Sequence, residues 1–402
     1  MSPPLWQPSP EEKEKTLLTH FSQKIQQKYN LKNIEYSTLH QWSIEFPELF
    51  WEEVWRDCEV LCSVPWDKVM SKKGFGEKIG TESSGWFTGT RLNFAENLLA
   101  QGKSENEALC FIGEDGSTRS LSYADLRKVV AQCASGLKAL GVTENDRVAA
   151  VLPNCPEAVI GMLAAASLGA IWSSCSPDFG INGIYDRLGQ ISPKILITVN
   201  AYNYNGKEHQ CLEKIREISQ RISSIEAVVV AAFTETPMEL EGKEQYWETL
   251  LDTSADPLEF AQLPFDHPLY ILYSSGTTGL PKSIVHGAGG TLLKHLTEHR
   301  YHADVQPGDR LFYYTTCGWM MWNWLASGLA SGATLILYDG APGFPDMGRM
   351  WHLIDDQRIT HFGTSPKFLG AVNKAGYSPK ANHRLDSLRA ILSTGSPLPA
   401  DL

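Results

Sequence analysis

The sequence predicts an α/β fold with two doubly wound α/β units, preceded by a mostly helical extension. From about residue 121 onward, short apolar runs alternate with longer stretches of helical pattern. The apolar runs are continuous, which is typical of parallel strands covered on both faces. The first hundred residues lack this rhythm and are rich in tryptophan. Strand–helix–strand repetition implies right-handed crossovers within a layered domain.

The helical extension is expected over residues 1–100 and opens with a helix start signal. Ser9 can cap a helix, Pro10 suits the first helical position, and Glu12 can close a capping box. Residues 93–99 have the pattern of a short helix that closes the extension. We interpret the aromatic residues between these helices as core. They are Trp42, Trp51, Trp55, Trp66 and Trp86.

A large α/β domain is expected over residues 101–402, and its first unit over about 101–265. A helical stretch after residue 123 stops at Gly141, a glycine suited to end a helix. Residues 234–266 are acidic and weakly periodic, so we expect a surface connection there. Strands are predicted at 147–152, 170–174, 194–199 and 227–232, and helices at 124–140, 156–168, 183–190 and 208–221.

The second unit is expected over about residues 266–402, where the same rhythm resumes. Glycine-rich residues follow its first strand, and the final residues have the pattern of a loop that leads into a new helix. Strands are predicted at 269–273, 310–314, 333–338, 361–363 and 390–392, and helices at 290–301, 320–330, 347–357 and from 366.

Composition limits the function classes. The chain has 402 residues and a net charge of −11, which argues against a general nucleic-acid binder. Its longest nearly apolar stretch, residues 158–172, is shorter than the roughly 20 residues of a membrane span. Neither the eight cysteines nor the eleven histidines show zinc-ligand spacing, so no metal site is expected. Free thiols and the absence of a signal pattern at the start favour a cytoplasmic protein. No pattern indicates an oligomeric state.

A glycine- and hydroxyl-rich loop follows the strand at 269–273 and has the chemistry of a phosphate site. Glycines let backbone N–H groups converge on an anion, the hydroxyl groups add donors, and lysine adds a point charge. The P-loop pattern fails because Pro281 precedes the lysine, and the dinucleotide pattern lacks its first glycine. Composition alone would leave an ordinary serine- and threonine-rich turn. The candidate phosphate ligands are Ser274, Ser275, Gly276, Thr277, Thr278, Gly279 and Lys282.

The run Tyr-Ser-Ser-Gly-Thr-Thr-Gly-Leu-Pro-Lys, residues 273–282, closely resembles the signature of the acyl-adenylate-forming superfamily, which includes acyl-CoA synthetases, luciferases and adenylation domains. Residues 86–97 and 286–290 resemble the branch that holds the acetyl-CoA and acetoacetyl-CoA synthetases. The run Gly-Trp-Met-Met-Trp-Asn-Trp at 318–324 is most similar to the acetoacetyl-CoA synthetases, as are residues 337–340.

The resemblance implies an ATP-dependent ligase with small-molecule substrates and two half-reactions. The acid, expected to be acetoacetate, would attack the α-phosphate of ATP with the help of Mg²⁺, and the thiol of coenzyme A would then displace AMP. The loop would hold the β- and γ-phosphates, and Gly395, Ser396 and Pro397 would lie beside the adenine. Ser396 stands where acetyl-CoA synthetases carry glutamate, which puts that contact in doubt. Arg187 aligns with a residue that holds a phosphate of coenzyme A; an exposed helix arginine is the alternative.

By the same resemblance, Trp319, Met320 and Met321 would form the wall of the acyl pocket, with Thr394 near its end. Asn323 is our candidate donor for a β-keto oxygen. Helical spacing alone would instead place Met320 and Met321 in a core with two neighbouring tryptophans, and for Trp322 and Trp324 we keep that interpretation.

Relatives continue into a mobile carboxyl-terminal domain that carries a catalytic lysine. The resemblance therefore implies that this domain is absent from the chain, that the chain holds no catalytic residue, and that alone it has little or no synthetase activity. Two other functions stay open. One is an acetyl-, propionyl- or butyryl-CoA synthetase of the same family, and the other is a non-catalytic nucleotide-binding protein.

Overall fold

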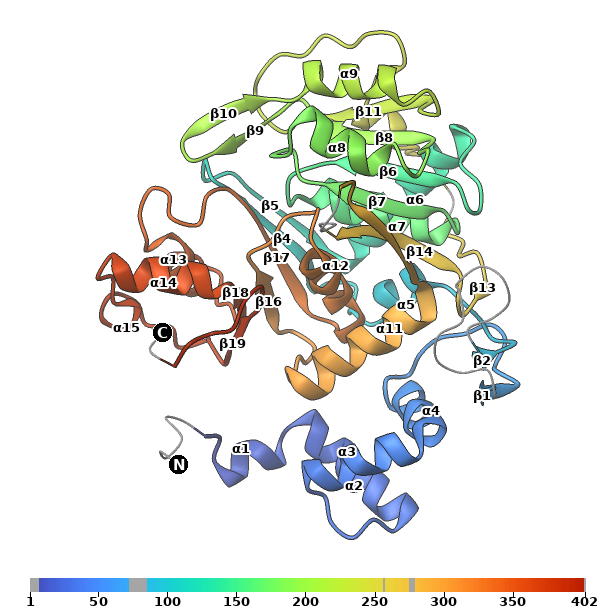
Figure 1. The fold of residues 1–402 in the computed structure, drawn as a ribbon, viewed down its shortest axis with the longest axis vertical. Coiled ribbons are helices and arrows are strands. Elements are labelled where there is room, and N and C mark those ends of the chain that lie inside the picture. The colour runs from blue at the N-terminus through green and yellow to red at the C-terminus, as the bar shows by residue number, and fades with distance from the viewer. Residues whose placement is uncertain (1–6, 72–84, 256, 275–278, 401–402) are drawn as a thin grey trace.

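The computed structural model describes residues 7–71, 85–255, 257–274 and 279–400. Two sheets lie at the centre, helices pack around them, and the amino-terminal helices lie to one side (Figure 1). The α/β class and the two layered sheets predicted from the sequence are confirmed.

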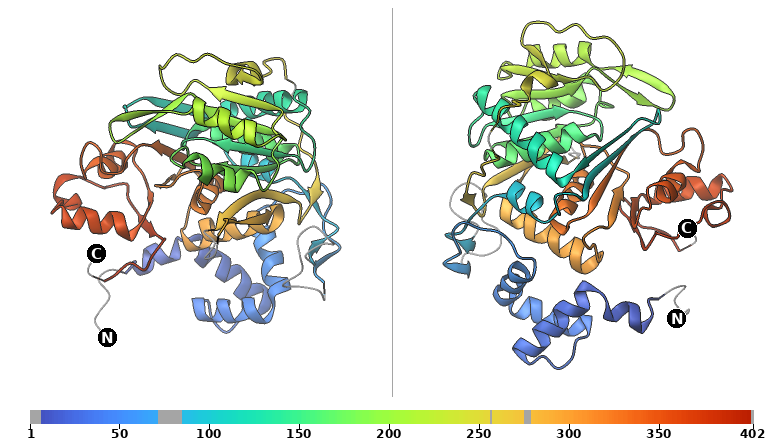
Figure 2. Two further views of the ribbon diagram at one scale, coloured as in Figure 1. Left: turned by 45° about the horizontal axis from the view of Figure 1, so that its top comes forward. Right: turned by 180° about the vertical axis from the view of Figure 1, so that it is seen from behind.

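The amino-terminal extension is mainly helical in the described residues. Its first helix has the expected capping box, in which Ser9 and Glu12 exchange side-chain and backbone hydrogen bonds. Phe21 in α2 stacks on Tyr301 with ring centroids 4.6 Å apart, so the extension packs on the main body beside α11 (Figure 2). The helices are α1 (Pro10–Glu14), α2 (Leu17–Tyr29), α3 (Tyr36–Glu45), α4 (Pro47–Asp57) and α5 (Phe94–Ala100).

The first sheet has seven strands in the order β12-β11-β8-β6-β7-β14-β15. All neighbours run parallel except β14 and β15, which form an antiparallel hairpin at one edge. The strands are β6 (Arg147–Val151), β7 (Ile171–Cys175), β8 (Ile195–Val199), β11 (Ala227–Ala231), β12 (Glu244–Tyr246), β14 (Pro268–Ser274) and β15 (Lys282–Gly287).

The second sheet has six strands in the order β19-β18-β16-β17-β4-β5, and only the β4–β5 pair is antiparallel. The strands are β4 (Glu107–Gly113), β5 (Thr118–Ser122), β16 (Arg310–Tyr313), β17 (Thr334–Asp339), β18 (His361–Thr364) and β19 (Ala390–Ser393).

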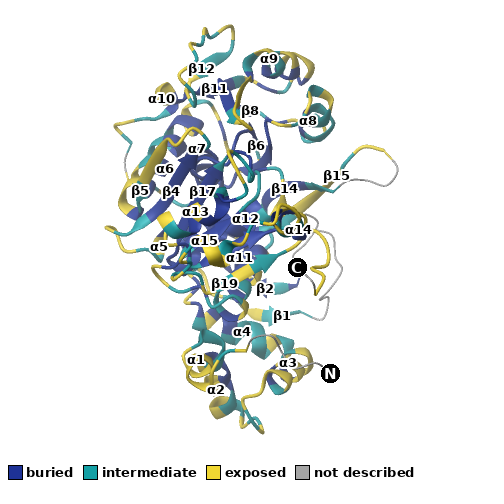
Figure 3. Cartoon of the chain, turned by 90° about the vertical axis from the view of Figure 1, so that its left-hand side faces the viewer, coloured by how far each residue is buried: buried dark blue, intermediate teal, exposed yellow. Residues whose placement is uncertain are grey.

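Helices cover both sheets, and the largest core lies between the sheets (Figure 3). All twelve residues of α7 are buried, because this helix lies inside the core that the two sheets share. The covering elements are α6 (Tyr123–Ala139), α7 (Pro156–Ser167), α8 (Ile181–Leu188), α9 (Leu212–Arg221), α10 (Trp247–Leu250), α11 (Ala288–Thr297), a π-helical turn (Glu298–His302), α12 (Met320–Ala326), a 3₁₀ helix (Ser327–Ser331), α13 (Arg349–Asp356), α14 (Pro366–Lys374) and α15 (Pro379–Asn382).

Among the described residues, three strand pairs lie outside the main sheets. In the extension, β1 (Lys68–Met70) pairs with β2 (Trp86–Thr88), and β3 (Arg91–Leu92) pairs with β13 (Leu263–Pro264). A hairpin of β9 (Ala201–Tyr204) and β10 (Lys207–Gln210) stands where the sequence predicted the start of a helix. Its turn is Asn205-Gly206, and both residues have positive φ, as a tight hairpin turn requires.

The division near residue 265 that was expected from the sequence does not follow the two sheets. Strand β4, from the first half, pairs in parallel with β17 over five residues, while β14, from the second half, pairs with β7. Each sheet therefore contains strands from before and after residue 265. The apolar strands pair according to how they pack around the shared core, and not according to their order in the chain. The extent of the domains themselves stays a prediction.

Candidate functional site

The predicted site residues lie where strands of the two sheets reach their carboxyl ends. Ser274 ends β14, and Arg187 lies in α8, which follows β7. Trp319 follows β16, and Thr394 follows β19. In open α/β sheets, ligands bind at this edge. The fold thus places four separately predicted segments after the carboxyl ends of strands.

The predicted phosphate loop connects β14 to β15, and we call these two strands the phosphate hairpin. Ser274 pairs with Lys282 in the antiparallel ladder. Lys282 is exposed, and Gly279 has a φ of +144°, in the region that favours glycine. The side chain of Gln190 donates to the Pro281 carbonyl over 2.8 Å, so the hairpin touches the end of α8. Four of the predicted ligands, Ser275, Gly276, Thr277 and Thr278, lie outside the described residues.

The residues predicted for the acyl pocket differ sharply in exposure. Trp319 is 61% exposed and Met320 is 49% exposed, whereas Met321 is half-buried. Asn323, our candidate donor, is only 1% exposed, and neither atom of its amide has a hydrogen-bond partner among the described residues. Buried amides are nearly always paired, so this group is available to a ligand or to water. Trp322 and Trp324 are core residues, as expected.

Arg187, predicted to contact coenzyme A, is held in a fixed position. Its guanidinium donates to the Gly183 carbonyl over 2.6 Å and lies over the Phe179 ring, 4.6 Å from the centroid. It is half-buried, which argues against a freely exposed helix arginine. Phe179 also reaches Gly318, where an added Cβ would meet the ring at 3.3 Å. The residue predicted for coenzyme A therefore approaches the segment predicted for the acid.

The residues predicted beside the adenine, Gly395, Ser396 and Pro397, follow β19 and are exposed, as is Thr394, which was predicted for the end of the acyl pocket. The Thr394 amide donates to the Thr364 carbonyl over 3.3 Å, which continues the sheet by one residue. The buried hydroxyl groups of Thr364 and Ser393 have no partner among the described residues. Polar groups of this kind at the end of neighbouring strands can receive a polar ligand.

A polar cavity of about 120 Å³ lies between the carboxyl ends of the two sheets. Asp178, after β7, and Asp339, at the end of β17, both line it. Burial, and then the nearby Asp178 carboxylate, raise the pKa of Asp339 to about 8. Asn154 and Thr316 also line the cavity, and each has a buried polar atom without a partner among the described residues.

Sequence patterns match one family over most of the chain. Residues 98–402 match the AMP-binding enzyme family, and residues 36–98 match the acetyl-coenzyme A synthetase N-terminus. The chain belongs to the AMP-binding enzyme family.

Named relatives of this family narrow the comparison. An acetoacetyl-coenzyme A synthetase from Rhizobium meliloti is 45% identical over 98% of this chain and 60% of its own length. A malonamoyl-CoA synthetase from Penicillium aethiopicum is 42% identical over 95% of this chain and 56% of its own length. The solved structure of an acetoacetyl-CoA synthetase from Streptomyces lividans superposes with a TM-score of 0.93 at 40% identity, over 100% of this chain and 61% of that chain. The chain thus spans about 60% of the length of the curated relatives it matches.

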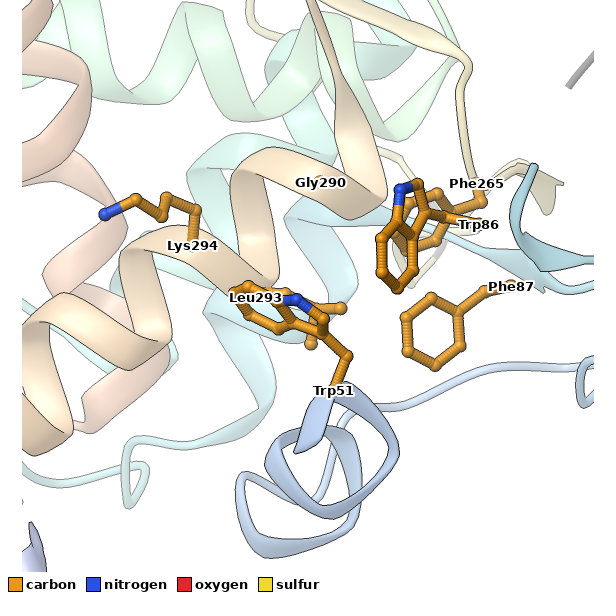
Figure 4. A pocket seen from close by; sticks show the side chains of 7 residues that line it. All are labelled: Trp51, Trp86, Phe87, Phe265, Gly290, Leu293 and Lys294. Atoms are coloured by element: carbon orange, nitrogen blue, oxygen red, sulfur yellow. The ribbon is translucent and has the colours of Figure 1, made fainter. Parts of the chain in front are cut away.

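An apolar pocket of about 190 Å³ lies between the extension and α11 (Figure 4). Trp51 and Trp86 of the extension line it together with Leu293 of α11. Lys294 is its one charged lining residue; it points away from the rings and pairs with Glu298. The pocket lies where the aromatic extension meets the main body, and none of the predicted site residues that the structure describes lines it.

Within the described ranges, no three His, Cys, Asp or Glu side chains gather as metal ligands, and no helix has the length and hydropathy to cross a membrane. All eight cysteines are free, and seven of them are buried.

Sequence reasoning did not find the polar cavity. Asp339 ends β17, and Asp178 comes three residues after the end of β7. Their position at the ends of strands is the signal that could have pointed to them. Phe179 carries no such signal, because its contact with Arg187 and its approach to Gly318 arise from tertiary packing.

Proposed function

We propose that the protein to which this chain belongs uses ATP to activate acetoacetate as an acyl adenylate, and then forms acetoacetyl-CoA. The products of the complete reaction would be acetoacetyl-CoA, AMP and pyrophosphate. The observation that carries this proposal is the segment from Gly318 to Trp324 at the carboxyl end of β16, in a chain 45% identical to an acetoacetyl-CoA synthetase.

The proposed roles follow the placement of the segments. Lys282, Ser274 and the loop between them would hold the β- and γ-phosphates by charge and by backbone N–H groups. Gly395, Ser396 and Pro397 would lie beside the adenine. Arg187 would meet a phosphate of coenzyme A, because its guanidinium is fixed at the edge where the strands end.

Magnesium would enter with the nucleotide. The ATP phosphates would supply part of its coordination, since Mg²⁺ commonly binds through substrate phosphates. The ion would neutralise phosphate charge as the acid attacks. Catalysis would then depend on positioning and charge neutralisation.

The acid would lie against Trp319, Met320 and Met321, with Thr394 at the end of the pocket. Met is apolar and adaptable, which suits a short acyl chain. The unpartnered amide of Asn323 could donate to the β-keto oxygen. A site built around such a bond rejects acids that lack the keto group, because its own polar atoms would then stay unpaired.

The malonamoyl-CoA synthetase relative makes a second acid worth testing, since malonamate carries an amide carbonyl where acetoacetate carries a ketone. Acetate, propionate and butyrate lack that carbonyl. We expect the cytoplasm as the place of action, because all eight cysteines are free.

A substrate panel on the full-length protein tests the proposal. Pyrophosphate release would be measured with acetoacetate, malonamate, acetate, propionate and butyrate, each with ATP, Mg²⁺ and coenzyme A. We expect the highest kcat/KM with acetoacetate. Preference for acetate would overturn the proposed substrate, and no release with any acid would favour a non-catalytic nucleotide-binding protein. Residues 1–402 alone should form no CoA thioester, and robust formation would contradict that expectation.

A further inference from the structure

Trp319 and Met320 are exposed, so packing against the protein does not fix the position of their side chains. Each has about half or more of its surface in water. The nearest fully buried residues before and after this pair are Cys317 and Trp322, which are both 0% exposed. The position of residues 317–322, which we call the entry segment, must therefore be set at its two buried ends.

Three hydrogen bonds join these buried ends to β7 and to the residues that follow β6 in the first sheet. The hydroxyl of Ser174, in β7, donates to the Cys317 carbonyl over 2.7 Å. The Cys317 thiol donates to the Pro153 carbonyl over 3.2 Å. At the other end, the Trp322 indole N–H donates to the side-chain oxygen of Asn154 over 3.0 Å. The entry segment follows a strand of the second sheet, so these bonds cross between the sheets.

The entry segment also lies directly on the loop after β7. A Cβ added at Gly318 would be 3.4 Å from the Ser176 amide nitrogen and 3.3 Å from the Phe179 ring, so a side chain here would press on that ring. Small displacements here would be passed on to the neighbouring exposed residues, because interiors are close-packed.

We propose that Asn154 is a positioning residue for acid binding, because its side-chain oxygen fixes the carboxyl-terminal end of the entry segment through the Trp322 indole. The inference rests on the proposed function, in which Trp319, Met320 and Met321 contact the acid. Asn154 does not touch the acid; it acts through Trp322.

The bond between Asn154 and Trp322 is suited to this role because both partners are buried. Asn154 is 2% exposed and Trp322 is 0% exposed, so the bond is shielded from bulk solvent. Loss of the Asn154 oxygen would leave the Trp322 indole N–H without an acceptor. The start of α12 would then shift so that this N–H can reach another acceptor. A shift of about 1 Å in a binding segment can cost about a hundredfold in rate.

Two reciprocal variants of the full-length protein test the proposal. Asn154→Ala removes the acceptor, and Trp322→Phe removes the donor while keeping an aromatic ring. We expect each to raise KM for acetoacetate about tenfold while KM for ATP stays within twofold, since the phosphate hairpin is held elsewhere. Because both changes break the same bond, the double variant should be no worse than either single variant within about twofold.

Asn97→Ala is the matched control. Asn97 is also a buried asparagine, at 3% exposed, and it bonds to the backbone of Leu61 and Asn93, in the extension. Its loss should lower the melting temperature and leave KM for acetoacetate unchanged. If Asn154→Ala raises both KM values together, or if the effects of the two variants multiply, the positioning role is overturned.

Amide hydrogen exchange separates failure of this inference from failure of the proposed function. Both variants should speed exchange in residues 315–323 and leave residues 282–287 unchanged. If the wild-type protein turns over none of the acids, the proposed function fails, and exchange alone decides whether Asn154 anchors the segment. Unchanged exchange in residues 315–323 would overturn the anchor. If Asn154→Ala fails to fold, Trp322→Phe carries the same test.

Discussion

The phosphate hairpin and the entry segment both lie at carboxyl ends of strands, yet the fold supports them in opposite ways. In the hairpin, β15 is the edge strand of its sheet, and Lys282 to Val285 are exposed (Figure 3). In the entry segment, two exposed residues stand between buried ends that are bonded to the other sheet.

The difference follows from the forces that each region would use. Attraction between a lysine and a phosphate falls slowly with distance, so an ammonium group on an exposed hairpin can still hold an anion after a small displacement. Contacts with an apolar chain are lost within an ångström. A site that recognises the shape of a short acid therefore needs a packed scaffold, whereas a polyphosphate site can stand on a strand edge.

The largest expected effect is a difference in the free energy of unfolding between variants of two tryptophans in the entry segment. Trp322→Ala should lower the free energy of unfolding by about 3–5 kcal/mol, because it empties a fully buried site. Trp319→Ala, three residues earlier in the sequence, should change it by less than about 0.5 kcal/mol, because the side chain is exposed. Chemical denaturation of both variants measures the contrast, and equal losses would show that the exposed residue is held by packing after all.

The second effect is kinetic and belongs to the hairpin. Lys282→Ala in the full-length protein should lower kcat/KM for ATP about a hundredfold, or about 2.7 kcal/mol, through loss of a charge on the phosphates. Its unfolding free energy should stay within about 0.5 kcal/mol, since Lys282 is exposed. Lys207→Ala, an exposed lysine on β10, is the control and should keep normal kinetics. Unchanged kinetics in Lys282→Ala would remove this residue from the site.

The strands of both regions could be predicted from the sequence, but their pairing could not. Strand β6, predicted at 147–152, runs from Arg147 to Val151, since a continuous apolar run reports local burial. The pairing of β4 with β17 joins residues far apart in the chain, and no local pattern specifies it. The β9–β10 hairpin was missed although Asn205-Gly206 is a strong local turn signal.

The candidate site divides in the same way. Motifs located residues by their type, as with Lys282 and Trp319, and the fold places those segments at the ends of strands. Which tryptophan faces water and which faces the core depends on how α12 docks, because both have the same side chain and lie three residues apart. The meeting of Asp178 with Asp339 likewise depends on two sheets closing on one cavity.

Asp339 allows a test in the buried surroundings of the entry segment. The cavity that it lines is also lined by Thr315 and Thr316, which precede that segment. Its pKa is raised to about 8 by burial and by Asp178, whereas an unfolded aspartate titrates near 3.9. Between these values the folded state keeps a proton that the unfolded state has released. Stability therefore falls as pH rises from about 4 to about 8 and becomes level above that.

Asp339→Asn removes this titration and should gain stability relative to wild type by about 2 kcal/mol between pH 6 and pH 8, within the limit of about 1.4 kcal/mol per pH unit. Denaturant unfolding at pH 6, 7 and 8 measures the gain. Asp386→Asn, at an exposed acidic residue that does not line the cavity, is the control and should show no such gain. A constant difference across this range would mean that Asp339 is ionised throughout.

The smallest expected effect concerns Gln190, a side chain just after α8 that contacts the hairpin. Gln190 donates to the Pro281 carbonyl over 2.8 Å and accepts from the Ser283 hydroxyl over 3.3 Å, both in exposed positions. Water can replace such bonds, so Gln190→Ala should raise KM for ATP by no more than about twofold, or about 0.4 kcal/mol. Steady-state kinetics of the full-length protein would detect a larger change. A tenfold rise in KM for ATP would mean that the phosphate hairpin depends on a fixed anchor, as the entry segment does. The proposed difference between a hairpin that acts by charge and a segment fixed by packing would then be wrong.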